Sequence, residues 1–246
     1  LVHTDKIEQT NEQEIHYIIQ FKKGDVIKLG NKTVTIPVSN RLIITKTTVN
    51  ETVPFSQAYF SYIEKHAGNI KSNVLSSFNC ILDREILKER LEYVKNHIGK
   101  YKNNNSKGIV FFEDAHYHDR EVKELCLEML YPYVDIVSMN EEELEYTLKM
   151  YDLPIDTEDI FSCVGGAEYI REKFGIQKGV IVHTKDYSMY VGEEIEADIE
   201  KGLILGNMLA TAKAISGWYG TKEQIGEILK LPLSERGMKF KKSIGE

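Results

Sequence analysis

The stretch Ile136-Val137-Ser138-Met139-Asn140-Glu141-Glu142-Glu143-Leu144-Glu145 decides the fold of this chain. A short apolar run ends there, and a helix begins at Asn140, with Glu143 three residues later as in a capping box. The same residues form an Asn-x-x-Glu motif, which can place a carboxylate beside a metal-bound phosphate at the end of a strand. A plain helix cap and a catalytic motif need the same residues, so both interpretations stay open on this stretch alone.

The segments around this stretch alternate between strands and helices. Strands are predicted at 73–77, 108–112, 134–138, 179–184 and 187–191, and helices at 55–66, 83–97, 119–131, 141–151, 164–174, 201–217 and 221–230. This alternation indicates parallel βαβ units, and strands without polar alternation are typical of a sheet covered on both faces. The fold class that we predict is therefore α/β, with a parallel-sheet core.

The first part of the chain has a different pattern. Residues 14–48 carry β-rich runs separated by turn signals such as Gly30-Asn31, which predict a small antiparallel sheet of about four strands. Pro37 suits an edge or a strand end. We therefore expect two domains, with residues 1–50 as part of a small β-sheet domain and residues 51–246 as an incomplete α/β core.

Composition excludes several classes of protein. The chain has 246 residues, 42% of them hydrophobic, and a net charge of −7 without a basic stripe, so nucleic-acid binding has little support. It has no apolar run of transmembrane length and no signal-peptide pattern. The three cysteines lie far apart without zinc-site spacing, and we expect a reduced, cytoplasmic protein in which Cys126 is a core residue. Because the chain starts at Leu1, we expect it to be part of a longer polypeptide.

Ligands of open parallel sheets lie beyond the carboxyl ends of the strands, so polar residues at those ends are candidates for a site. Such residues are Ser76 and Ser77, Glu113 and Asp114, Asn140 to Glu143, and His183 and Thr184. Two carboxylates from neighbouring strand ends, Glu113 and Glu143, can hold a hydrated Mg²⁺, which prefers oxygen ligands and bridges phosphate oxygens. The helix N-terminus at Asn140 adds a weak positive end beside them.

Each of these residues also has a structural interpretation. Glu113 can be an exposed acid that begins a loop, and His183 can be a hydrogen-bonded structural histidine. Arg41, at the start of a strand, can be a surface cation. The run His116-Tyr117-His118-Asp119 invites a transition-metal site, but we favour a solvated loop in which Asp119 is the N-cap of the next helix.

Taken together, the segments resemble the ADP-dependent glucokinases and phosphofructokinases, sugar kinases of the ribokinase-like superfamily. The resembling stretches are Ile15–Phe21, Ser39–Ile43, Val110–Ala115, Val134–Leu144, Gly179–Thr184 and Leu231–Gly237, which occur in the family's order over most of the chain. The motif Asn140–Glu143 matches the family's Asn-x-x-Glu motif.

The resemblance implies a ribokinase-like α/β core with a β-sheet lid, and transfer of the β-phosphate of ADP to a sugar hydroxyl with Mg²⁺. It implies that Glu113 and Glu143 organise the metal and that Arg41 and Asn140 bind phosphate. It further implies that His183 and Thr184 lie near the adenine side of the nucleotide. The implied partners are ADP and a sugar or sugar phosphate, with no nucleic acid and no membrane.

Two departures from the family pattern affect this expectation. Phe111 stands where the family's His-x-Glu motif has its histidine, so only Glu113 of that motif remains. The family's Gly-x-Gly-Asp motif, which supplies the general base, is not found, and we expect it beyond Glu246. We therefore expect these 246 residues alone to have little or no catalytic activity. The alternatives are a non-catalytic nucleotide- or sugar-binding homologue and an ATP-dependent ribokinase-like kinase.

Overall fold

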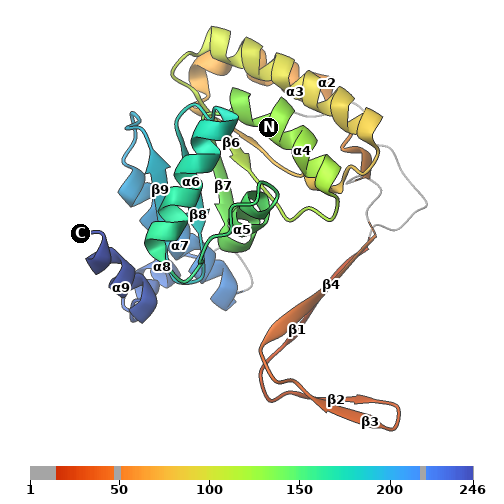
Figure 1. The fold of residues 1–246 in the computed structure, drawn as a ribbon, viewed down its shortest axis with the longest axis vertical. Helices are drawn as coiled ribbons and strands as arrows, with labels where there is room; N and C mark the ends of the chain where they lie inside the picture. The colour runs from red at the N-terminus through yellow and green to blue at the C-terminus, as the bar shows by residue number, and fades with distance from the viewer. Residues whose placement is uncertain (1–14, 47–50, 217–219, 246) are drawn as a thin grey trace.

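The computed structural model describes residues 15–46, 51–216 and 220–245 (Figure 1). Four strands come first: β1 (Ile15–Phe21), β2 (Val26–Leu29), β3 (Lys32–Thr35) and β4 (Asn40–Lys46). The other strands are β5 (Ser72–Leu75), β6 (Ile109–Glu113), β7 (Ile136–Asn140), β8 (Gly179–His183) and β9 (Ser188–Gly192). The helices are α2 (Gln57–Lys65), α3 (Arg84–Asn104), α4 (Arg120–Met129), α5 (Glu141–Lys149), α6 (Ile160–Phe174), α7 (Ile199–Ser216), α8 (Lys222–Ile228) and α9 (Glu235–Ser243).

The core of the fold is a five-stranded sheet in the order β5-β6-β7-β8-β9. The first four strands are parallel, and β9 returns antiparallel to β8. The parallel strands put their carboxyl ends at one edge of the sheet, where Glu113 pairs with Ser138 and Asn140 pairs with His183. The predicted α/β fold with a mostly parallel sheet is therefore confirmed.

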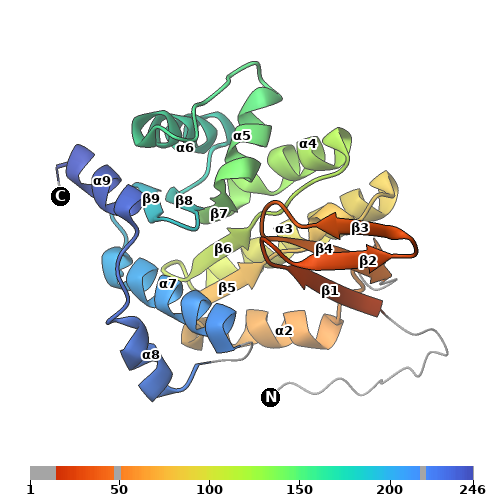
Figure 2. The same ribbon diagram turned by 90° about the horizontal axis from the view of Figure 1, so that it is seen from below.

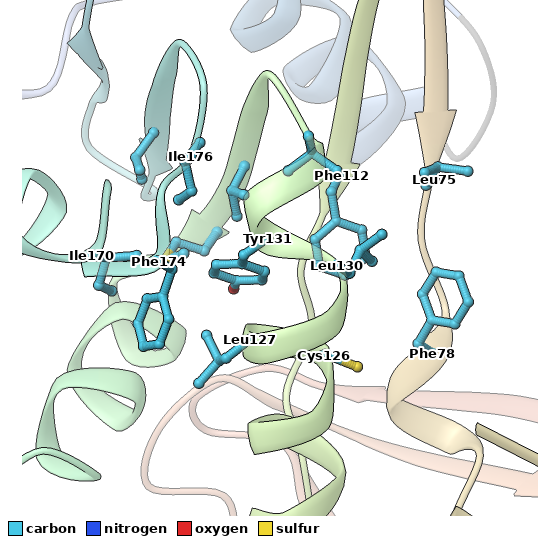
Figure 3. Close-up of a cluster of buried hydrophobic side chains, with 14 of the residues drawn as sticks. Leu75, Phe78, Phe112, Cys126, Leu127, Leu130, Tyr131, Ile170, Phe174 and Ile176 are labelled. Atoms are coloured by element: carbon cyan, nitrogen blue, oxygen red, sulfur yellow. The ribbon is translucent and has the colours of Figure 1, made fainter. Parts of the chain in front are cut away.

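Alternate residues of the central strands make the core on one face of this sheet. Helices α3, α4 and α6 cover that face, and Figure 3 shows part of the resulting cluster of buried side chains. Buried members from the strands are Val110, Phe112, Val137, Met139, Val180 and Val182. Cys126 is fully buried in this cluster, which confirms its prediction as a core residue. The intervening strand residues, including Glu113 and His183, point to the opposite face, on whose side α7 lies (Figure 2).

Helix α7 stands out because its apolar residues occur on all sides of the helix rather than on one face. Of its 18 residues only Ala212 is buried, although helices of this composition are normally enclosed. Ile204, Leu205, Leu209 and Ile215 are all about half exposed or more. The prediction of a sheet covered on both faces is thus only partly met, since Val74 of β5 is also 64% exposed.

The first four strands do not form the four-stranded sheet that the sequence predicted. They form two separate two-stranded ladders, β1 with β4 and β2 with β3, which follow one another along an extended ribbon (Figure 1). Pro37 has no N–H to donate and lies where the ladder is interrupted, opposite a turn with Gly24 at a φ of +92°. The Gly24 N–H donates to Ile36 O and the Ile36 N–H donates to Asp25 O, both at 2.9 Å, so the pairing of β2 with β3 extends up to this break.

Two helices also differ from prediction. Asp83 caps α3 as expected, with bonds from the N–H groups of Glu85 and Ile86, but the helix continues to Asn104 rather than ending near 97. Helix α9 was not predicted. It begins at an N-cap, Ser234, and is tied to the β8–β9 turn by a bond of 2.9 Å from Ser234 Oγ to Asp186 Oδ1.

A buried histidine on α3 predicts a dependence of stability on pH. His97 is 1% exposed, with Nδ1 2.9 Å from Glu64 Oε1 and Nε2 2.8 Å from Asn73 Nδ2. Burial lowers the pKa of His97 below its ordinary 6.5, against the opposing effect of Glu64. The unfolded chain therefore takes up a proton at a higher pH than the folded chain, and folding loses stability as the pH falls below about 6.5.

We expect the variant His97→Gln to lose this part of the pH dependence. The measurement is urea unfolding at steps from pH 7.5 to pH 5. His66→Gln, at the end of α2, is the control and keeps the wild-type slope. If the free energy of unfolding of His97→Gln fell with decreasing pH as steeply as that of the wild type, His97 would not be the source of this pH dependence.

Candidate functional site

The carboxyl edge of the sheet gathers the polar groups that the sequence singled out. Glu113 ends β6, Asn140 ends β7 and His183 ends β8. Beyond β5, Ser77 adopts the left-handed conformation at a φ of +75°, and its Oγ lies 3.1 Å from that of Ser76. A side chain other than glycine held in this region is uncommon and marks a constrained turn.

Glu143 is fixed by a capping box at the start of α5. Its backbone N–H donates to Asn140 Oδ1 at 2.8 Å, and its Oε2 accepts the Asn140 backbone N–H at 2.9 Å. The predicted cap is therefore present, and it determines where the carboxylate lies. Burial raises the pKa of Glu143, and the bond from the Asn140 N–H opposes that effect.

Glu113 is held by a histidine from another strand. His183 Nε2 lies 3.1 Å from Glu113 Oε1, and both side chains are 42% exposed. The hydrogen bond to Glu113 raises the pKa of His183, which the charges of Glu113, Glu143 and Glu141 raise further. The structure thus brings Glu113, His183 and the α5 N-terminus together at one edge of the sheet.

Thr184 follows His183, but its hydroxyl is already occupied. Thr184 Oγ1 accepts the backbone N–H groups of Asp186 and Tyr187, both at 3.0 Å, and donates to Tyr187 O at 3.1 Å. It therefore shapes the β8–β9 turn. A groove of about 520 Å³ opens beyond this turn between β9, α7 and α9, and Asp186, Ser188 and Asn207 supply polar groups to its walls.

Asp114, unlike its neighbour Glu113, does not face the candidate site. It points into the core, where its Oδ2 accepts from Lys123 and from the Tyr131 hydroxyl, the latter at 2.8 Å. Lys123 is 1% exposed and also faces the rings of Tyr117 and Tyr131. Sequence reasoning missed this cluster, because a lysine on an amphipathic helix is expected at the surface.

The loop after Glu113 leads into the predicted N-cap of α4, although Tyr117 within the loop is buried rather than solvated. Asp119 accepts the N–H groups of Glu121 and Val122 as N-cap of α4, and it pairs with Arg84 at 2.6 Å. His116 and His118 lie with their ring centroids 5.0 Å apart. Within residues 51–216 and the other described ranges, no group of three or more His, Cys, Asp or Glu side chains is arranged to hold a metal ion.

A divalent cation bound at this edge would therefore need oxygen atoms from water or from a bound phosphate, in addition to those of the protein. Mg²⁺ commonly takes one or two carboxylates and completes its octahedron with water and phosphate oxygens. The hard oxygen donors of Glu113 and Glu143 fit that pattern. Arg41 lies on β4, outside the five-stranded sheet, and its phosphate contact stays a prediction.

Replacing the α5 cap has a predictable cost. Asn140→Ala removes the acceptor for the Glu143 N–H, and we expect the free energy of unfolding to fall by about 1 kcal/mol. Asn140→Asp keeps an acceptor oxygen and should stay close to wild type. Urea unfolding followed by circular dichroism measures both variants, and an Asn140→Ala curve that overlays the wild type would show that the cap contributes nothing.

Fold and site together define the class. This is an α/β protein with a candidate site at the carboxyl edge of a mostly parallel sheet, where carboxylates lie beside a helix N-terminus. The ADP-specific phosphofructokinase/glucokinase conserved region matches residues 1–238, and the chain belongs to that family. The family predicted from the sequence is thereby confirmed.

Individual relatives agree with this assignment. An ADP-specific phosphofructokinase of Thermococcus kodakarensis is 25% identical over an alignment that covers 91% of this chain and 51% of that protein. An ADP-dependent glucose/glucosamine kinase of Pyrococcus furiosus is 23% identical over 99% of this chain and 53% of its own length. The chain spans about half the length of the curated relatives that it matches.

Solved structures support the fold. An ADP-dependent kinase in complex with fructose-6-phosphate and ADPβS matches with a TM-score of 0.75 and 20% identity, over 98% of this chain and 55% of that one. A hypothetical ADP-dependent phosphofructokinase of Pyrococcus horikoshii gives a TM-score of 0.71 and 22% identity, over 94% and 54% of the two chains. No described helix of the present chain is long and apolar enough to cross a membrane.

Proposed function

We propose that the whole protein is an ADP-dependent sugar kinase, which transfers the β-phosphate of ADP to a hydroxyl of glucose or of fructose 6-phosphate. The observation that carries this proposal is the strand-end arrangement of a chain in this family, where Glu113 ends β6 and Glu143 stands in the first turn of α5. Relatives bear the names of both activities, so both sugars remain candidates.

The residues have separate roles in this proposal. Glu113 and Glu143 would hold Mg²⁺ through carboxylate oxygens, and the ion, when bound, would supply positive charge that neutralises the phosphate oxygens. The amide of Asn140 and the N-terminus of α5 meet the phosphates. The adenine side of the nucleotide lies toward His183 and Thr184, and the groove of about 520 Å³ opens beyond the turn that follows these two residues.

The β1–β4 ribbon belongs to a lid in this proposal, with residues 1–50 in the lid domain and residues 51–246 in the core domain. The ribbon shares no ladder with the described five-stranded sheet, which supports a separate domain. Arg41, exposed on β4, meets phosphate when the lid closes. The three free cysteines fit a reducing cytoplasm.

Titration calorimetry of this chain tests the proposal directly. ADP and ATP are each titrated with Mg²⁺ and with EDTA, and the sugar titrations follow in the presence of ADP. We expect ADP to bind more tightly with Mg²⁺ than without it, and more tightly than ATP. Binding of ATP alone would favour an ATP-dependent kinase, and no binding of either nucleotide would overturn the proposed site.

A further inference from the structure

Glu113 and Glu143 are held by different means, although both lie at the same edge of the sheet. Glu143 is fixed by its own helix cap, through two bonds with Asn140. Glu113 accepts no backbone N–H among its described contacts, and its Oε1 is engaged only by His183. Without that contact, its side chain would be free to change rotamer at a half-exposed strand end.

The bond between His183 and Glu113 crosses a whole strand. Glu113 belongs to β6 and His183 to β8, and β7 lies between them. Two strand spacings are about 10 Å, so both side chains must extend over the end of β7 to meet at 3.1 Å. The bond therefore passes over the end of β7, where α5 begins and where the proposed function places the phosphates.

Stability alone gives little reason for such a bond. A pair in which both side chains are 42% exposed is well solvated, and exposed pairs contribute little to folding. A role in metal binding gives a better reason, since a group that hydrogen-bonds to a metal-binding carboxylate orients that carboxylate for the ion. With Oε1 engaged by the imidazole, Oε2 is the oxygen of Glu113 that a cation can take.

We propose that His183 is a positioning residue, which holds the Glu113 carboxylate over the end of β7 so that it can bind a divalent cation together with Glu143. This inference rests on the proposed function. It differs from a direct nucleotide contact by His183, because it requires the effect of the histidine to depend on the metal.

The test measures binding of Mn²⁺ and ADP to this chain. Calorimetry and the electron paramagnetic resonance signal of free Mn²⁺ are the two readouts. The variants are His183→Ala, which removes the imidazole, and His183→Gln, which keeps a donor of similar reach. The control is His66→Ala, a half-buried histidine at the end of α2, which packs against Tyr62 instead of a carboxylate.

We expect His183→Ala to weaken binding of ADP with Mn²⁺ about tenfold, the loss typical when the partner of a metal ligand is removed. Binding of ADP in EDTA should fall by a smaller factor than binding with Mn²⁺, and the melting temperature should stay at its wild-type value. His183→Gln should recover part of the loss, and His66→Ala should match the wild type.

Two results would overturn the inference. Equal binding of Mn²⁺ and ADP by His183→Ala and wild type would show that Glu113 needs no support. An equal loss with and without metal would show that His183 contacts the nucleotide itself. Failure of the wild type to bind Mn²⁺ and ADP would instead refute the proposed function, and it would be seen before any variant is made.

Discussion

Replacement of Lys123 by methionine should lower the free energy of unfolding by about 3–5 kcal/mol. The substitution keeps the length of the side chain but leaves the carboxylate of Asp114 buried without its cation. Asp114 is 4% exposed, and its Oδ1 already has no hydrogen-bond partner in the structure. The Tyr131 hydroxyl, at 2.8 Å from Oδ2, would remain as the only donor in the described cluster.

Urea unfolding followed by circular dichroism measures this loss. The double variant Asp114→Asn/Lys123→Met removes both charges, and we expect it to recover most of the stability, because no uncompensated charge remains in the core. Lys107→Met is the matched control, since Lys107 pairs with Glu196 while both are more than three-quarters exposed. It should change stability by less than about 0.5 kcal/mol. A Lys123→Met protein as stable as wild type would show that water reaches the Asp114 carboxylate and takes the place of Lys123.

Replacement of Glu143 by glutamine should weaken binding of ADP with Mg²⁺ by about 10- to 100-fold or more, because loss of a ligand should cost at least as much as loss of its supporting partner. Glutamine retains the oxygen that accepts the Asn140 N–H, so the capping box and the fold are kept. The loss should therefore appear in the metal-dependent part of binding, measured by calorimetry with Mg²⁺ and with EDTA.

Glu142→Gln removes the same charge one residue earlier, from an exposed position on α5. We expect it to bind ADP with Mg²⁺ as the wild type does. If both variants lose affinity alike, the effect comes from the net charge of the helix N-terminus rather than from a ligand role of Glu143.

The order of strands and helices in the core was predictable because its signals are local. Asp83, Asp119 and Asn140 each precede a helix at the capping position, and each accepts the expected N–H groups. Strand ends follow from the same local signals, which explains why the amino-acid sequence is enough to place Glu113, Asn140 and His183 at the ends of strands.

Contacts between distant segments were not predictable in this way. The bond of His183 to Glu113 joins residues 70 positions apart, and it requires knowledge of the strand order. Burial of Lys123 depends on Asp114 and Tyr131, which come from a strand end and a short 3₁₀ helix. Helix α9 was missed because Gly237 is an unfavourable helix residue, but a Cβ there would meet Asp186 O at 2.3 Å, so close packing requires the glycine.

The reversal of direction at β9 also has a use in protein engineering. The turn between β8 and β9 lies at the carboxyl end of the parallel strands, where the candidate site is, whereas the connection that follows Gly192 leaves from the opposite end. Lys185, exposed in that turn, is therefore a suitable attachment point for an environment-sensitive dye that reports occupancy of the site. The connection after Gly192 is the better place for an affinity tag, because a tag there stays at the opposite end of the sheet.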